Sequence, residues 1–569
     1  MAKQDPQKWN VMIFLAGNNS LSEECVYGLT EVVDAGVNRF NSNVAVCAKL
    51  STGVHRGTFL NLRDPEIKNR DELHKKLNAA LVKQHLANED PKKPPLSVAE
   101  RIYEFVSESL KVNDSKNADH HMLILAGHGN GALGEFLQED RPRKPKNDTP
   151  QHDKPNSSAR ESKPDSEMDL PDLGTLIARI KNKLLNNRPL DVLGLDSCLM
   201  SMTEIAYAVH NHVKVMVGAE GFEPMAGWPY PKILERVSDN LDLNELGRKI
   251  VDEYIEYYTV YQAADLSVDL TASDLSETVM VMKAIRSLAD VLTPILNAYP
   301  NPIGSPSRSS VVVRDAVLLA HWEAQLYKNE QYTDIYDFCT LLKARLSTKE
   351  YLYEQNGKLQ DEYGDVRRAC QNVLNAIAGA EKEQRREGDK WEPKLANDNY
   401  TAEWWPLHER ESRKDEEERW WIPVNFRTAK GFILKSCYSG WAVQYSFGVS
   451  VYFPWSKVPL DMDQYKDLNF AQDSKWADFL AAYLNATKRE ERAGKGTKTV
   501  LPDVLIRDNF DVAPAATFVQ HPTGLYRNAE SNRNAESNRS LTNIIGSMKN
   551  PATEFWECQD FDPPDRNRK

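Results

Sequence analysis

Residues 193–200 read LGLDSCLM, and this short stretch decides the fold. Its apolar beginning continues from Val192 and predicts a short buried strand of a parallel sheet. Cys198 follows this run, and a helical pattern then extends from residue 199 to residue 209. We therefore expect Cys198 at a junction between a strand and a helix, where the N-terminal end of the helix lowers the pKa of a thiol.

A second stretch of the same design lies upstream. Residues 121–126 read HMLILA and predict another buried strand, and residues 127–131 read GHGNG, with His128 in second place. The carboxyl ends of parallel strands meet at one edge of an open sheet. The imidazole of His128 and the thiol of Cys198 are therefore expected to lie close together at that edge.

Strands and helices alternate through this part of the chain. Apolar runs predict further strands, and apolar positions at helical spacing predict helices. The strands are residues 10–16, 43–50, 58–62 and 213–218, and the helices are residues 21–33, 98–110 and 170–184. Capping boxes are expected at Ser20 with Glu23 and at Ser97 with Glu100. This alternation predicts the α/β class, with a doubly wound, mostly parallel sheet flanked by helices.

The length allows two or three domains. We assign residues 1–265 to the α/β domain and residues 266–487 to a mainly helical C-terminal region, which contains a charged insertion at 384–420. Residues 488–569 are a polar tail that we interpret as linker. The expected elements of the C-terminal region are helices at 277–296, 311–326, 335–346, 366–383 and 476–484 and strands at 430–437 and 448–454.

Charge and apolar content limit the partners. The formal net charge is −12, which argues against general nucleic-acid binding. We find no window of about 20 apolar residues and no secretory signal pattern, so we expect no membrane span and a cytoplasmic location. The 7 cysteines are scattered and without metal-site spacing, which favours reduced thiols over a disulfide framework.

These motifs resemble the clostripain-like cysteine peptidases, which share a clan with caspases, gingipains and legumain. The resemblance covers roughly residues 8–485 without the insertions. The segments that carry it are the strand 9–16 with Asn18 and Asn19, the element 127–129, the element 196–200, and residues 217–223 with Gly227, Trp228 and Tyr230. The resemblance implies a caspase-like fold and makes residues 1–265 the catalytic domain.

The resemblance also implies roles at the two strand ends. Cys198 would be the nucleophile, and His128 would protonate the leaving amine. The backbone N–H groups of Gly129 and Cys198 would form the oxyanion hole. No cofactor is required for this chemistry. A calcium requirement is an expectation taken from the family alone, and the metal-binding residues are unknown.

Asp196 would line the S1 pocket and pair with an arginine or lysine of the substrate, with Trp228 and Glu220 shaping the pocket wall. Each role has a plainer alternative. Asp196 is also a common helix N-cap, and a tryptophan often serves packing alone. A cysteine after a buried strand is often structural. Rival histidines for the base are His120, His121, His210 and His212, at a strand start and a helix end.

The insertion at residues 139–166 predicts a mobile surface loop because its only apolar side chains are Ala159 and 5 prolines. It holds 7 lysines and arginines, and it offers sites for self-cleavage. Proline follows 4 of these basic residues directly and would block cleavage there. The remaining candidates are Arg160, which we place first, then Lys146 and Arg143.

The function predicted first is a cysteine endopeptidase that cuts polypeptides after arginine in preference to lysine, through a thioester acyl-enzyme and with self-processing at 139–166. One alternative is a caspase-like effector in bacterial defence or cell death, switched on by a ligand or activator at the C-terminal region. Another is a non-catalytic caspase-like scaffold. We expect neither nucleic acid nor membrane as a partner.

Overall fold

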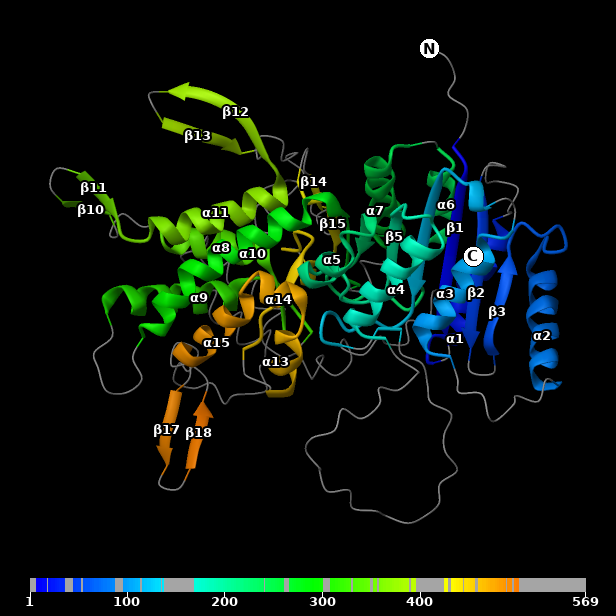
Figure 1. Ribbon diagram of the computed structural model, residues 1–569, viewed down its shortest axis with the longest axis horizontal. Helices are drawn as coiled ribbons and strands as arrows, with labels where there is room; N and C mark the ends of the chain where they lie inside the picture. The colour runs from blue at the N-terminus through cyan, green and yellow to red at the C-terminus, as the bar shows by residue number, and fades with distance from the viewer. Residues whose placement is uncertain are drawn as a thin grey trace, which may run out of the picture. The chain divides into compact units, whose positions relative to one another are not determined.

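The structure is a computed structural model (Figure 1). The residues that it describes are 7–17, 19–35, 44–52, 55–86, 96–112, 115–134, 136–137, 168–239, 241–259, 266–299, 307–328, 331–347, 352–355, 358–387, 390–395, 424–427, 431–443, 445–455, 459–487, 489–493 and 496–500. They form two compact units. Unit 1 takes its described residues from 1–197 and 225–241, and unit 2 takes its own from 198–224 and 242–564. The predicted domain boundary at residue 265 divides the chain differently from these two units, and it stays a prediction.

Unit 1 contains the predicted parallel sheet. Its strands are β1 (Trp9–Gly17), β2 (Val44–Thr52), β3 (His55–Asn61), β4 (His120–Ala126) and β5 (Leu190–Asp196). They lie in the order β5-β4-β1-β2-β3, and all neighbours are parallel except β2 and β3. Ala126 is the register partner of Asp196, so β4 and β5 end at the same level. The mostly parallel α/β fold is therefore confirmed.

The helices of unit 1 begin where the sequence offers a cap. They are α1 (Ser22–Asp34), α2 (Arg70–Leu86), α3 (Val98–Ser109), α4 (Leu170–Lys183) and α6 (Tyr230–Val237). Asp169 forms a full capping box with Asp172 at α4, and the hydroxyl of Ser97 accepts a bond from the Glu100 N–H at α3. The capping box expected at Ser20 is wrong, because α1 begins after Leu21, which provides no side-chain cap.

Both faces of the unit 1 sheet are covered. On one face, the ring of Phe14 packs against that of Phe105 from α3, with 6.1 Å between their centroids. On the other face, a Cβ added to Gly194 would come within 2.9 Å of the Trp228 ring and 3.1 Å of Ile124. Successive side chains of a strand point to opposite faces, and the register partner of Ile124 is the residue before Phe14. The sheet is therefore doubly wound, as predicted.

Unit 2 has an antiparallel sheet, unlike unit 1. Its strands are β6 (Val213–Gly218), β7 (Val268–Asp274), β14 (Val424–Arg427) and β15 (Ile433–Ser439), in the order β14-β15-β7-β6. All three pairings are antiparallel. A small sheet is formed by β8 (Leu326–Tyr327), β9 (Tyr332–Asp334) and β16 (Ser450–Tyr452). The described residues also form the hairpins β10 (Leu352–Gln355) with β11 (Lys358–Asp361), β12 (Ala380–Glu387) with β13 (Lys390–Leu395), and β17 (Arg489–Ala493) with β18 (Gly496–Val500).

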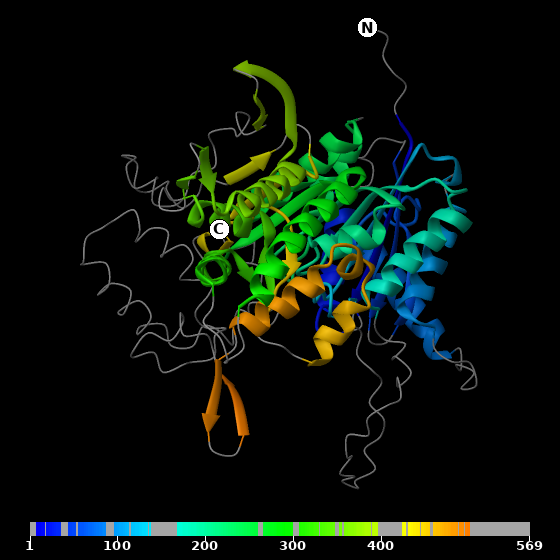
Figure 2. The ribbon, with the colours of Figure 1, turned by 60° about the vertical axis from the view of Figure 1, so that its left-hand side comes forward.

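The helices of unit 2 confirm the expected helical content. They are α5 (Thr203–Val209), α7 (Leu243–Thr259), α8 (Thr278–Asn297), α9 (Arg308–Glu323), α10 (Ile335–Arg345), α11 (Gly364–Ala378), α13 (Pro459–Lys466), α14 (Asn469–Asp473) and α15 (Trp476–Thr487). Short 3-10 turns lie at Leu275–Glu277 and Trp441–Val443 in this unit and at Ser115–Asn117 in unit 1. Helices α8, α9, α10, α11 and α15 pack together in one cluster, which Figure 2 shows from a second side.

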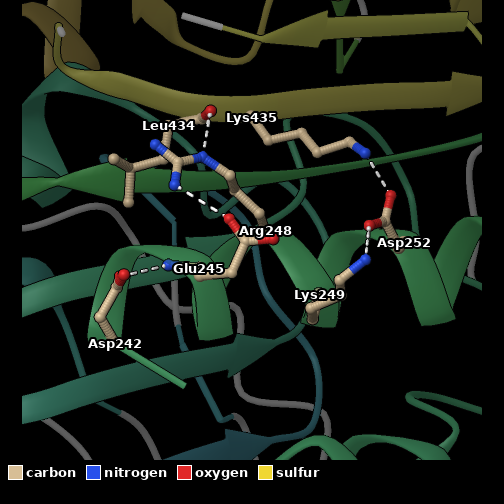
Figure 3. Close-up of polar contacts among 7 residues, drawn as sticks. All are labelled: Asp242, Glu245, Arg248, Lys249, Asp252, Leu434 and Lys435. Atoms are coloured by element: carbon tan, nitrogen blue, oxygen red, sulfur yellow. Dashed lines mark hydrogen bonds and ion pairs between the residues drawn. The ribbon is translucent and has the colours of Figure 1, made fainter. Parts of the chain in front are cut away.

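Charged side chains fasten α7 to β15 (Figure 3). The Lys435 ammonium pairs with Asp252, and the Arg248 guanidinium donates to the Leu434 carbonyl oxygen at 3.3 Å. Asp252 also lies 3.4 Å from Lys249, one turn back on the helix. Lys435 is only 8% exposed, so this pairing compensates a buried charge. These contacts hold α7 on the sheet that contains β7.

No helix among the described residues is long and apolar enough to cross a membrane. The 6 cysteines in these ranges are buried and form no disulfide with one another. The insertion at 139–166, the block from 396 to 420 and the tail beyond residue 500 lie outside the described residues.

Candidate active site

His128 belongs to unit 1 and follows β4 by two positions. Its Nε2 atom lies 3.0 Å from the hydroxyl oxygen of Ser20, in the turn after β1. The N–H of Gly127 donates to the carbonyl oxygen of Asp196 at 3.1 Å, which joins the tips of β4 and β5. The neighbouring strands of the sheet therefore place the imidazole, and β1 supplies its hydrogen-bond partner.

The loop that carries His128 is closely packed. Its carbonyl oxygen accepts from the N–H of Leu137 at 2.8 Å. Gly127 has a φ of +155°, and a Cβ there would lie 3.0 Å from Leu137 and 3.1 Å from Ala16. Only glycine allows this close approach, which explains one of the glycines around His128.

The rival histidines occupy other places. His120 and His121 begin β4, whereas His128 follows its far end, roughly 20 Å along the strand. The ring of His120 stacks on Trp9, and burial lowers the pKa of His121 to about 4. In unit 2, His210 follows α5 and bonds the Tyr207 carbonyl oxygen at 2.6 Å. These contacts indicate structural roles.

Asp196 ends β5 and is 6% exposed. Its Oδ2 atom accepts from the N–H of Trp228 at 3.3 Å and from the hydroxyl of Tyr230. A Cβ on Gly227 would lie 3.0 Å from the same oxygen, so the chain passes directly over the carboxylate. Asp196 caps no helix, because the N-cap of α5 is Met202. The carboxylate is instead held by the segment 227–230.

Trp228 is 1% exposed, and its ring lies on Gly194 of β5. This contact favours the packing role over the predicted role in the S1 wall. Trp228 still contributes to the site through its backbone, which donates to Asp196.

Cys198 is the first residue of unit 2 and is 3% exposed. Its Sγ atom accepts from the N–H of Glu223 at 3.3 Å and lies 3.8 Å from the carbonyl oxygen of the same residue. The expected helix from residue 199 is wrong. Leu199 has a φ of +64°, which is strained for a residue with a branched side chain, and α5 begins only at Thr203. Cys198 therefore lies in a sharp turn, and the argument from a helix N-terminus does not apply to its thiol.

Glu220 is fully buried in unit 2. Its carboxylate accepts from the hydroxyl of Ser446 at 2.6 Å and from the N–H of Gly448 at 2.8 Å. Burial and the neighbouring Asp334 and Asp269 raise the pKa of Glu220 well above its usual range. A carboxyl group held in this way belongs to the interior, so we leave Glu220 out of the S1 pocket that we propose below.

Within the described ranges, no group of three or more His, Cys, Asp or Glu side chains is placed to hold a metal ion. This part of the chain therefore offers no calcium site of that kind, and we derive no step through calcium. The self-cleavage candidates Arg160, Lys146 and Arg143 lie outside the described residues.

Several contacts at the site were missed by sequence reasoning. They are the bonds from Ser20 to His128, from Tyr230 to Asp196 and from Glu223 to Cys198. The sequence pattern predicts a helix cap at Ser20, and Tyr230 enters only through the resemblance. Nothing in the local pattern around Ser20 or Glu223 indicates which distant residue each one contacts.

A family model described as the clostripain family of C11 peptidases matches residues 103–483. The match contains His128 and Cys198 and begins after β1, β2 and β3. No curated protein matches the chain.

Solved structures of C11 proteases are also similar to the chain. A secreted C11 cysteine protease from Bacteroides thetaiotaomicron, in complex with an irreversible peptide inhibitor, is 13% identical, with a TM-score of 0.43 over 83% of this chain and 99% of that chain. An inactive zymogen C11 protease from Parabacteroides distasonis is 15% identical, with a TM-score of 0.41 over 83% and 99% of the two chains. A B. fragilis cysteine protease is 16% identical, with a TM-score of 0.29 over 55% and 94%.

Proposed function

The chain belongs to the clostripain family, and from this premise we propose that it is an endopeptidase that cleaves after arginine in preference to lysine, with Cys198 and His128 as its catalytic dyad. Membership makes the chain a cysteine peptidase that acts on polypeptides and needs no cofactor for its chemistry. The dyad, the preference for basic residues and the self-processing are our proposals.

One observation carries the dyad. The Gly127 N–H donates to the Asp196 carbonyl oxygen at 3.1 Å, so the residue before His128 is bonded to the residue two positions before Cys198. The register of β4 and β5 also pairs their last residues, Ala126 and Asp196, so both strands end at the same level of the sheet. A nucleophile and its acid–base partner need this kind of proximity to act on one peptide bond.

The chemistry proceeds in two steps. The thiolate of Cys198 attacks the scissile carbonyl carbon, and the N–H groups of Gly129 and Cys198 bind the oxyanion. The imidazolium of His128 gives a proton to the leaving amine, and the C–N bond breaks to leave a thioester. Water then attacks the thioester carbonyl carbon and the imidazole takes the water proton. The C–S bond breaks to release the acid product, and the thiolate and the imidazolium are regenerated. Because the hydroxyl of Ser20 is hydrogen-bonded to Nε2 of His128, Nδ1 is the nitrogen that exchanges these protons.

Asp196 supports the preference for basic residues. It is a nearly buried carboxylate whose orientation is fixed by Trp228 and Tyr230. A fixed carboxylate can receive both prongs of a guanidinium, which favours arginine over lysine. The insertion at 139–166 contains 7 basic residues, which are the residue types after which the proposed enzyme cleaves. We therefore propose self-processing in this insertion, with Arg160 as the first cleavage site.

The test is hydrolysis of fluorogenic peptides that end in arginine, lysine or aspartate. Cys198→Ala and His128→Ala should abolish turnover while the protein stays folded, as checked by circular dichroism. Cys437→Ala and His210→Ala are matched controls that remove a thiol and an imidazole elsewhere, and they should cleave at the wild-type rate. Turnover that survives in either dyad variant would refute the dyad, and equal cleavage after aspartate would refute the specificity.

A calcium requirement, an activator that binds the C-terminal region and a cytoplasmic location stay predictions from the sequence. Full activity in the presence of a chelator would remove the first of them.

A further inference from the structure

A short segment of unit 2 holds the turn that contains Cys198. This segment, residues 219–223, runs beside residues 198–201, and three backbone N–H groups make hydrogen bonds between the two. The Glu223 N–H donates to Cys198 Sγ at 3.3 Å, the Leu199 N–H donates to the Gly221 carbonyl oxygen at 2.8 Å, and the Ser201 N–H donates to the Ala219 carbonyl oxygen at 2.7 Å. The position of the thiol therefore depends on the position of the 219–223 segment.

One carboxylate, that of Asp269, binds the backbone of the 219–223 segment. Asp269, on β7, accepts from the Glu220 N–H through Oδ2 at 2.7 Å and from the Gly221 N–H through Oδ1 at 2.9 Å. Asp269 is fully buried, so water does not compete for these two bonds. Both oxygens are used on consecutive backbone groups, which fixes the distance and the orientation of the segment relative to β7.

Gly221 is required by the same arrangement. A Cβ at this position would lie 2.6 Å from Asp269 Oδ1, closer than real contacts allow. The same added atom would lie 3.2 Å from the ring of Tyr327. The backbone at residue 221 is thus pressed against the carboxylate, and neither partner can shift without moving the other.

We propose that Asp269 is a positioning residue for the Cys198 nucleophile, acting through the 219–223 segment. The carboxylate holds Glu220 and Gly221, Gly221 holds Leu199, and Glu223 holds the sulfur. This inference rests on the proposed function, because it takes Cys198 as the nucleophile. A misplacement of about 1 Å at a reacting atom costs roughly 100-fold in rate, so a remote carboxylate can matter for catalysis.

Asp269→Asn is the direct variant. The amide keeps one acceptor oxygen and turns an NH2 group toward the other backbone N–H, so one of the two bonds is lost. We expect kcat to fall about 10- to 100-fold, with KM within about 2-fold of wild type, because the nucleophile moves and the substrate pocket does not. The second readout is the rate at which iodoacetamide alkylates Cys198, mapped by mass spectrometry, which we expect to change by a similar factor.

Gly221→Ala perturbs the same contact from the other side. We expect it to change kcat and the alkylation rate in the same direction as Asp269→Asn does. The kcat of the double variant should be no lower than that of the more impaired single variant, because both substitutions act on one contact. If Asp269→Asn does not fold, Gly221→Ala decides alone. The matched control is Asp274→Asn on the same strand, whose carboxylate accepts from the Ser276 N–H instead, and it should leave both rates unchanged.

The outcomes separate the two proposals. A folded Asp269→Asn or Gly221→Ala protein with wild-type kcat and wild-type alkylation would overturn the positioning role and leave the dyad intact. Peptidase activity that survives in Cys198→Ala would overturn the dyad, while the alkylation rates would still report whether Asp269 places the thiol.

Discussion

The hydroxyl oxygen of Ser20 lies 3.0 Å from Nε2 of His128, although 108 positions separate the two residues. The contact exists because β1 and β4 are neighbours in the parallel sheet, so the turns that follow them meet at one edge. A hydrogen bond on one nitrogen fixes the ring orientation and selects which nitrogen is available for proton transfer.

Ser20→Ala is the first test of this contact. We expect kcat to fall up to about tenfold, with KM unchanged, since a neutral hydrogen bond contributes about 0.5–1.5 kcal/mol. Ser20→Thr keeps the hydroxyl and should restore the rate, and Ser22→Ala removes a nearby hydroxyl as a control. Steady-state kinetics with one arginine peptide measures all three. A wild-type kcat in Ser20→Ala would show that the imidazole is held by other means.

The sequence was sufficient where structure is local. Strands β1, β4 and β5 are predicted because they are continuous apolar runs, and the start of α3 is predicted because Ser97 caps it. Helices α2, α6 and α7 and strand β7 were missed. In α2 the apolar positions do not gather on one face, and the Pro–Tyr start of α6 resembles a loop.

Gly194 gives a prediction about stability. Because a Cβ here would lie 2.9 Å from the Trp228 ring and 3.1 Å from Ile124, Gly194→Ala overpacks a closed interior. We expect it to lower the free energy of unfolding by about 1–3 kcal/mol, measured by urea denaturation. Gly28→Ala is the matched control, because its Cβ would lie 3.3 Å from Tyr230 inside helix α1, where alanine is favoured. Equal stability of Gly194→Ala and wild type would contradict the tight packing of Trp228.

Substitutions at Asp196 and Tyr230 can distinguish the effect of the Asp196 charge on substrate binding from the effect of its hydrogen bonds on stability. Asp196→Asn keeps the acceptor oxygen for Trp228 and Tyr230 but removes the charge. We expect kcat/KM for arginine peptides to fall roughly 10- to 100-fold, the equivalent of about 1.5–3 kcal/mol for a charged hydrogen bond.

Tyr230→Phe is the companion variant. It removes a donor and keeps the charge, so it should lower stability and preserve the preference for arginine. The two variants are compared by hydrolysis of arginine and uncharged peptides and by thermal unfolding. Unchanged cleavage of arginine peptides by Asp196→Asn would remove Asp196 from the S1 pocket.

The buried carboxyl groups of unit 2 predict a pH dependence of stability. Burial raises the pKa of Asp269 to about 6. Burial and the charges of Asp334 and Asp269 raise the pKa of Glu220 well above its usual range, and burial and the charge of Asp337 do the same for Asp334. A raised carboxyl pKa means that the folded protein holds the proton more tightly than the unfolded chain does. The resulting stability is fully present below about pH 4 and is lost as the pH rises through the folded pKa values.

Glu220→Gln isolates this effect, because the amide is neutral at every pH and can donate to Asp334. We expect the free energy of unfolding of the variant, relative to that of wild type, to increase as the pH rises from 5 to 8. The buried His121, whose lowered pKa acts in the opposite direction, contributes equally to both proteins and cancels. Urea denaturation across this range measures the difference, and a constant difference would contradict the raised pKa values.

The contacts that place the nucleophile could not be predicted from the sequence. A pattern with helical spacing at 199–209 is real, yet the first residues of this run use their N–H groups to bind Gly221 and Ala219 instead of forming a helix. The partners are contributed by distant segments, as Asp269 is for Gly221. Apolar periodicity reports which residues are buried, and it carries no information about which distant polar groups meet.

The last prediction concerns self-processing in the insertion at 139–166. The argument rests on the sequence, because these residues lie outside the described ranges. Proline follows Arg141, Lys144, Lys154 and Lys163 directly, and a proline after the cleaved bond blocks most peptidases. Arg143, Lys146 and Arg160 remain, and Arg160 stands farthest from any proline, in the sequence Ser-Ser-Ala-Arg-Glu.

We expect purified wild-type protein to convert into two chains that stay associated, because β4 and β5 pair along their length on either side of the cut. Intact mass spectrometry should locate the cut after Arg160, and Arg160→Ala should move it to Lys146 or Arg143 or prevent it. Cys198→Ala should remain a single chain, since it lacks the nucleophile. A nick that persists in Cys198→Ala would show that another protease makes it, and a wild-type protein that is fully active as a single chain would show that cleavage is not required for activity.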